Sequence, residues 1–141
     1  MVIKLRSEHL LEIEGHGKQT YPKECCGLLL GRISNDEKVV IQILRAENAR
    51  EEGQQHNRFL ISPRTMFDSQ KIARTNKMDV LGFYHSHPDA EACPSQFDLD
   101  HAWPFYAYVI LSVKKGKTKK MTCWKLSKDR SIFDFEEIIR V

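Results

Sequence analysis

Residues 80–98 constrain the possible fold more than any other segment of the chain. The apolar run Val80–Tyr84 predicts a buried strand. Pro88 is expected to end this strand, because proline lacks the backbone N–H that a sheet ladder needs. Side chains two positions apart on a strand lie on the same face, about 6.6 Å apart along the chain. His85 and His87 are therefore expected to project in the same direction.

A helix start is expected just after this strand. The sequence from Pro94 to Asp98 is typical of a helix N-terminus, with Ser95 as the N-cap and Asp98 in the first turn. A carboxylate on the first turn can fold back toward the two imidazoles across the short loop. Two imidazoles and a carboxylate are the ligands of a catalytic zinc site, in which a fourth position is left for water.

Each part of this segment also has a purely structural explanation. Two histidines at a strand end are often ordinary side chains, and Ser95-x-x-Asp98 alone fits the acidic form of a capping box. The combination favours a metal site, because an imidazole pair beside a carboxylate loses hydration without a gain in packing.

Length and composition indicate one soluble globular domain that covers residues 1–141. The net charge of +3 is mild, so it permits an acidic protein partner and does not require nucleic acid. The N-terminus has no apolar stretch long enough for a signal peptide, and no segment approaches the roughly 20 apolar residues of a membrane span. We therefore expect a cytoplasmic protein without a membrane partner, whose cysteines are free thiols.

Expected strands and helices alternate along the chain, which predicts an α/β three-layer sandwich with a mixed β-sheet flanked by helices. The expected helices are 7–15 and 62–77, and the second begins with Ser62 as N-cap and Pro63 at the first helical position. The expected strands are 25–31, 38–44, 59–61, 80–84, 105–113, 118–126 and a last one from residue 132. The polar stretch 47–58 is interpreted as a loop.

Other chemically capable residues have several possible roles. Cys25, Cys26 and Cys123 are interpreted as small core residues. Cys93 lies in the loop between the candidate ligands. Its possible roles are a further metal contact, a redox-sensitive neighbour of the site or a plain loop residue. His101 shares a helical face with Asp98 and is treated as a surface residue or a partner of a ligand rather than a ligand itself. The basic turn 114–120 is interpreted as solvated, or alternatively as a surface that steers an acidic partner.

The segment HSHPDAEACPSQFD resembles the signature of the JAMM (MPN+) metalloproteases: an upstream glutamate, then His-x-His-Pro, then six residues to Ser-x-x-Asp. The segment PKECCGLLLG looks like the first strand of that family, which places the glutamate at Glu24. Asn48 and residues 59–63 also look like family landmarks. The chain resembles the small stand-alone prokaryotic members, whose fold is similar to that of cytidine deaminases.

The resemblance implies a role for each motif residue. His85, His87 and Asp98 would hold Zn²⁺, Glu24 would be the general base, and Ser95 would help to stabilise the oxyanion. It also implies a zinc-dependent peptidase or isopeptidase. Its substrates would be ubiquitin-like or sulfur-carrier proteins, cut at the C-terminal Gly-Gly in a narrow, glycine-selective groove. The oligomeric state is not indicated by the sequence.

Three other functions agree less well with the sequence. A non-catalytic interaction module, like the metal-free MPN relatives, is disfavoured because the full ligand set is present. A zinc nucleobase deaminase carries H-x-E and P-C-x-x-C, whereas this chain has Cys93 before Pro94 and lacks the second cysteine. A DNA-repair relative of the same fold is disfavoured by the strand that follows Glu24, and DNA binding would show a steep salt dependence.

Overall fold

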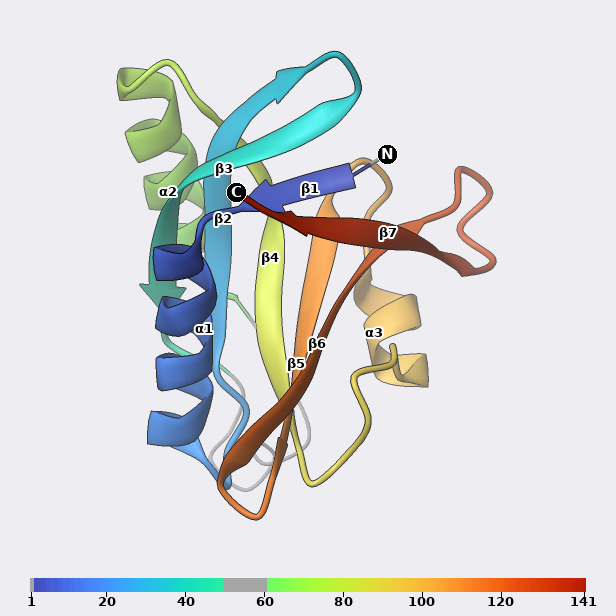
Figure 1. Cartoon of the computed structure of the whole chain (residues 1–141). Helices are drawn as coiled ribbons and strands as arrows, with labels where there is room; N and C mark the ends of the chain where they lie inside the picture. Colours follow the sequence, from blue (N-terminus) through green and yellow to red (C-terminus); the bar gives the residue numbers. More distant parts are fainter. Residues whose placement is uncertain (1, 50–60) are drawn as a thin grey trace.

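The computed structural model describes residues 2–49 and 61–141, in which seven strands and three helices form one unit (Figure 1). The strands are β1 (Val2–Leu5), β2 (Cys26–Ser34), β3 (Glu37–Ala46), β4 (Asp79–Pro88), β5 (Ala107–Lys114), β6 (Lys117–Leu126) and β7 (Phe133–Arg140). The helices are α1 (Ser7–Thr20), α2 (Pro63–Thr75) and α3 (Gln96–His101). Most of the predicted strand 59–61 lies outside the described residues, and Ile61 itself is not in a strand.

The sheet is mixed, as predicted, and it closes on itself. Its strand order is β1-β3-β2-β4-β5-β6-β7, and β1 pairs in parallel with both β3 and β7. The β4–β5 pair is also parallel, and the remaining neighbours are antiparallel. The three-layer sandwich is therefore not confirmed, because the twisted strands curve into a barrel rather than an open layer.

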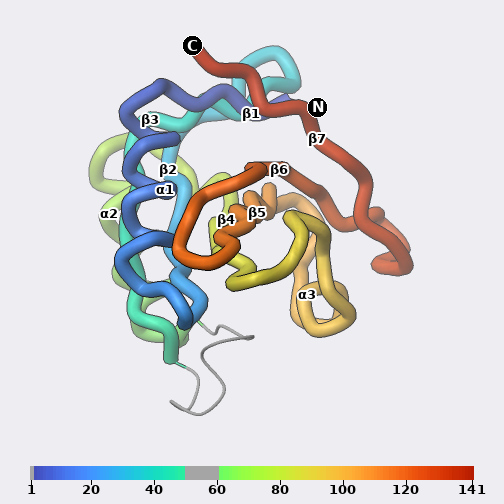
Figure 2. Tube along the Cα trace, turned by 60° about the horizontal axis from the view of Figure 1, so that its bottom comes forward, coloured from blue at the N-terminus to red at the C-terminus, as the bar shows by residue number. Residues whose placement is uncertain are grey.

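Helices cover both faces of the central strands (Figures 1 and 2). Ile13 of α1 belongs to the apolar core that includes Leu29 of β2, whereas Ala73 of α2 packs in a second core with Leu28 and Leu30. Adjacent residues of one strand therefore enter different cores, because side chains alternate across a sheet. This burial on both faces explains the continuous apolar run at the start of β2.

The first helix is longer than predicted. It runs through Gly15 and Gly17 to Thr20, beyond the predicted end at residue 15. Gly17 serves close packing instead, since a Cβ there would lie 2.7 Å from a methyl carbon of Leu111 on β5. The tertiary contact thus outweighs the low helix propensity of glycine.

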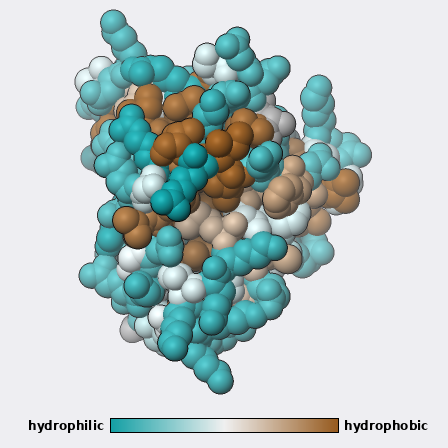
Figure 3. All heavy atoms as spheres, in the orientation of Figure 1, coloured by the Kyte–Doolittle hydropathy of each residue, from teal (hydrophilic) through white to brown (hydrophobic). Residues whose placement is uncertain are grey.

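The cysteines lie where the sequence predicts them. Cys25, Cys26 and Cys123 are buried free thiols, and Cys93 is an exposed one. The basic turn joins β5 to β6 at an end of the molecule where hydrophilic side chains dominate the surface (Figure 3). Among the described helices, none has the length and apolar character that a membrane crossing requires.

Candidate metal centre

The end of β4 places two imidazoles against each other. His85 and His87 are both buried, and their Nε2 atoms lie 3.1 Å apart. The strand extends through both histidines to Pro88, so the two-residue repeat holds them on one face. The same-face prediction is confirmed.

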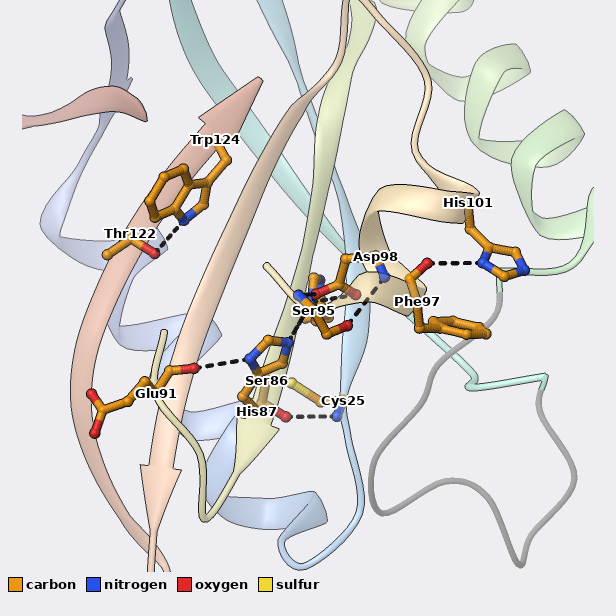
Figure 4. A network of polar contacts seen from close by, with 11 residues as sticks. Cys25, Ser86, His87, Glu91, Ser95, Phe97, Asp98, His101, Thr122 and Trp124 are labelled. Carbon is orange, nitrogen blue, oxygen red and sulfur yellow. Dashed lines mark hydrogen bonds and ion pairs between the residues drawn. The ribbon is translucent and has the colours of Figure 1, made fainter. Parts of the chain in front are cut away.

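The first turn of α3 brings Asp98 close to His87 (Figure 4), and the carboxylate also reaches His85. Ser95 is the N-cap: its Oγ accepts a hydrogen bond from the Asp98 N–H at 3.1 Å, and its own N–H donates to Asp98 Oδ2 at 2.8 Å. This capping box turns the carboxylate back toward the strand. Asp98 Oδ2 lies 3.1 Å from Nε2 of His87, and Oδ1 lies 3.3 Å from Nε2 of His85.

Glu24, which lies two residues before β2, approaches the same cluster. The antiparallel register aligns Cys26 with His85, so its extension by two residues aligns Glu24 with His87. Ser86 fixes the residues just before β2 against β4, because its Oγ accepts a hydrogen bond from the Cys25 N–H at 2.8 Å. Glu24 is only 4% exposed, and ligand atoms of Glu24, His85 and His87 lie within 4.8 Å of one another. Strand pairing thus joins motif residues that are about 60 positions apart.

The hydrogen bonds of His87 show that this cluster suits a cation. Nδ1 of His87 lies 2.9 Å from the carbonyl oxygen of Glu91, which can only accept, so Nδ1 must carry the proton. In the neutral imidazole, Nε2 is then a bare lone pair that faces the Asp98 carboxylate. A lone pair and an anion at 3.1 Å repel each other, so a proton or a metal ion is favoured between them. Burial would lower the pKa of His87, but its contacts with Asp98 raise this pKa overall, which shows that the position attracts positive charge.

The spacing between the imidazole nitrogens and the carboxylate oxygens also fits zinc. Zinc binds imidazole nitrogen and carboxylate oxygen at about 2.0–2.2 Å in a tetrahedron, which requires donors roughly 3.3–3.6 Å apart. The two Nε2 atoms lie 3.1 Å apart, and each faces a different oxygen of Asp98: Oδ2 lies 3.1 Å from His87 and Oδ1 lies 3.3 Å from His85. The set is slightly tighter than this tetrahedral edge, so these residues fit the metal with little movement.

The charge states also favour a divalent ion. Burial alone would raise the pKa of Asp98, but His85, His87 and the Ser95 N–H hold it well below its ordinary value, so the carboxylate is ionised. Burial lowers the pKa of His85, and the nearby Asp98 opposes this only in part. An anionic carboxylate beside a neutral imidazole is the protonation state that metal binding needs.

Two residues near the motif do not join the cluster. His101 is exposed, stacks on Phe97 and lies 2.8 Å by its Nδ1 from the Phe97 carbonyl oxygen, as expected for a surface residue. Cys93 lies exposed in the loop that precedes α3. The Glu91 carbonyl, in contrast, orients a candidate ligand and was missed, because a backbone group leaves no signal in the residue types.

An apolar cavity of about 660 Å³ adjoins the cluster on the side of His85 and Asp98. Aromatic side chains dominate its wall, among them Phe83, Trp103 and Tyr108. A cavity with an apolar wall and a few convergent polar groups is the usual form of a ligand site. The candidate metal centre therefore lies at the edge of a space large enough for part of a substrate.

Comparison with known proteins agrees with this arrangement. Residues 6–127 match the family of prokaryotic homologs of the JAB domain. The chain belongs to this family. The structure superposes on a protein from Desulfitobacterium hafniense with a TM-score of 0.86 and 32% identity, covering 99% of this chain and 93% of that one. It also superposes on a protein from Salinibacter ruber with a TM-score of 0.76 and 38% identity, covering 100% of this chain and 92% of that one. A JAB1/MPN domain protein from Archaeoglobus fulgidus shares the fold, with a TM-score of 0.55 and 21% identity over 99% of this chain and 96% of that one.

Two curated relatives carry names that describe an activity. The JAB-family chain is 32% identical over 92 residues to the desampylase of Haloferax volcanii, which covers 64% of this chain and 63% of the relative. It is 32% identical over 108 residues to the human deubiquitinase MYSM1, which covers 75% of this chain and 12% of that protein. The matched region is therefore less than two thirds of either relative.

Proposed function

We propose that the chain is a zinc-dependent peptidase or isopeptidase that cuts at the C-terminal Gly-Gly of a ubiquitin-like or sulfur-carrier protein. The observation that carries the proposal is the convergence of His85, His87 and Asp98 around a point that also faces Glu24. Three N/O ligands with a separate carboxylate beside them are the parts of a hydrolytic zinc site.

Glu24 acts as the general base in this proposal. When bound, zinc supplies Lewis-acid polarisation and lowers the pKa of a coordinated water from 15.7 to about 7. The Glu24 carboxylate accepts a proton from the attacking water and later gives it to the leaving amine. Asp98 contacts Ser95 and both histidines and is assigned as a ligand, whereas Glu24 approaches the cluster from a different segment of the chain and is assigned the proton transfer.

Ser95 supports the other side of the reaction. Its backbone N–H and its Oγ hold the first turn of α3, yet the residue is exposed, so its O–H can donate to a substrate oxygen. A donor aimed at a developing oxyanion contributes about a hundred- to a thousandfold in rate. Ser95 therefore combines the cap that places Asp98 with a hydrogen bond to the tetrahedral intermediate.

The substrate class follows from the relatives together with the cavity. The names desampylase and deubiquitinase describe enzymes that remove ubiquitin-like modifiers. The cavity beside His85 and Asp98 offers an apolar surface on which an extended tail can lie as its Gly-Gly end approaches Glu24. A sulfur-carrier protein presents the same kind of tail, so it belongs to the same proposed class.

The decisive experiment compares the wild type with Glu24→Gln. Zinc-loaded protein is incubated with a ubiquitin-like protein extended beyond Gly-Gly, and the products are weighed by mass spectrometry. Loss of a general base should reduce the cleavage rate by about a hundredfold to ten-thousandfold. The bound zinc should stay near one equivalent, because Glu24 is not a ligand in the proposal.

A matched variant controls for the lost negative charge. Glu8→Gln changes an exposed glutamate on α1 and should leave both cleavage and zinc content unchanged. Zinc loss in Glu24→Gln would contradict the base assignment, and an inactive zinc-loaded wild type on all such substrates would favour a non-catalytic module.

A further inference from the structure

The loop between β4 and α3 is fastened to the sheet at four consecutive residues. Asp89 donates its N–H to the Val113 carbonyl at 2.7 Å, and its carboxylate accepts from the Lys115 N–H at 2.8 Å. The carbonyls of Ala90, Glu91 and Ala92 then each accept a hydrogen bond from a side chain of the sheet. A loop attached in this way has a fixed path.

Two hydroxyls hold the carbonyls on either side of Glu91. Ser112 of β5 donates to the Ala90 oxygen, and Thr122 of β6 donates to the Ala92 oxygen at 2.6 Å. Ser112 is 1% exposed and Thr122 is 5% exposed, so neither hydroxyl has ready access to water as an alternative partner. The Glu91 carbonyl between them is the group that fixes the tautomer of His87.

Thr122 is itself oriented by a neighbour. The indole Nε1–H of Trp124 donates to Thr122 Oγ1 at 2.8 Å, which directs the hydroxyl proton toward Ala92 (Figure 4). A line of hydrogen bonds therefore runs from Trp124 through Thr122 to the loop, and the loop carbonyl next to Ala92 meets His87. This line of hydrogen bonds starts on β6, two strands away from the candidate ligand histidines on β4.

We propose that Thr122 and Ser112 are positioning residues of the metal centre, which act through the loop backbone on the orientation of His87. The inference rests on the proposed function, because it assumes that His87 binds zinc. Partners that fix the tautomer of a ligating histidine typically change metal affinity 10- to 100-fold when removed. A merely structural role for the hydroxyls would change stability and leave zinc affinity as it is.

The test measures the zinc Kd of the whole chain by competition with a chromophoric chelator. Thr122→Val keeps the shape of the side chain but removes the hydroxyl, and it should weaken zinc binding about tenfold. Thr122→Ser keeps the hydroxyl and should restore affinity close to that of the wild type. Ser112→Ala tests the second hydroxyl from a different strand, and gives the answer if Thr122→Val does not fold.

Two controls separate positioning from stability. Thr75→Val removes a hydroxyl that donates to the Lys71 carbonyl on α2, and Ile13→Val thins the core under α1; both should keep the wild-type Kd. A folded Thr122→Val or Ser112→Ala with the wild-type Kd would overturn the positioning role alone. Absence of zinc binding by the wild type would overturn the proposed function as well.

Discussion

At the scale of single residues, the sequence shows the candidate ligands because local geometry brings them together. His85 and His87 share a face by strand periodicity, and Asp98 folds back because Ser95 caps its helix. These rules act over a few positions, so they can be read from residue order. The Glu91 carbonyl that orients His87 could not be predicted, since every residue has a carbonyl and only the folded loop selects one.

The structure offers two carboxylates to the same imidazoles, and Asp98→Asn distinguishes them. Asparagine keeps the shape and can still accept from the Ser95 N–H, but it removes the charge that faces both histidines. We expect zinc to be lost on dialysis, as measured by elemental analysis. Asp100→Asn changes an exposed aspartate of the same helix and should retain zinc. Zinc retained by Asp98→Asn, and lost by Glu24→Gln, would exchange the roles of the two carboxylates.

At the scale of elements, the apolar pattern predicted where strands lie, whereas the exact ends of strands and helices depended on tertiary contacts. The prediction for β2 began and ended within three residues of the observed strand, because burial on both faces leaves a continuous apolar run. The strand β1 was not predicted, since four residues without a clear apolar–polar alternation give too weak a local signal. The extension of α1 past Gly17 also depends on a partner, Leu111, that the local sequence cannot reveal.

Where α1 packs on β4, Nδ1 of His16 and the Tyr84 hydroxyl form a buried hydrogen bond of 2.7 Å. Burial, with Arg45 nearby, lowers the pKa of His16 from 6.5 to about 4, so the folded protein keeps this imidazole neutral. The unfolded chain binds a proton at the ordinary pKa. This contribution to stability is therefore complete above about pH 6.5 and is lost as the pH falls toward 4.

We expect the urea midpoint of the zinc-free protein to fall between pH 6.5 and 4, and to fall less steeply in His16→Gln. The variant removes one group whose protonation favours the unfolded state, although His85 contributes in the same direction. Equal slopes in the wild type and His16→Gln would show that His16 is not the group responsible.

At the scale of the whole molecule, closure of the sheet was the feature least visible in the sequence. The first strand, β1, lies between β3 and β7 and pairs with both. Its pairing with β7 joins a strand near the N-terminus to a strand near the C-terminus. Such pairing depends on long-range contacts and parallel register, for which local periodicity contains no information. An open sandwich is the natural expectation from alternating elements, and the closed barrel follows only when β1 is seen to bridge two strands.

The closed barrel contains a buried ion pair between Lys38 of β3 and Glu136 of β7. Nζ of Lys38 lies 3.0 Å from Oε1 of Glu136, and the two side chains are 1% and 3% exposed. Lys38→Met leaves a buried carboxylate without its partner, which should destabilise the fold by about 3–5 kcal/mol in urea unfolding. The double variant Lys38→Met with Glu136→Leu should recover most of this loss, because an apolar pair needs no compensation.

The matched control is the surface pair Lys4–Glu37 on the adjoining strands. Lys4→Met should cost no more than about 1 kcal/mol, since both side chains are partly exposed and solvent screens their attraction. Lys38 pairs with Ile33 near one end of β2, whereas Cys26, at the other end, is aligned with His85. Zinc affinity should therefore be unchanged in the folded Lys38 variants. A double variant no more stable than Lys38→Met would show that the ion pair itself, rather than the burial of an uncompensated charge, sets the stability of the closed sheet.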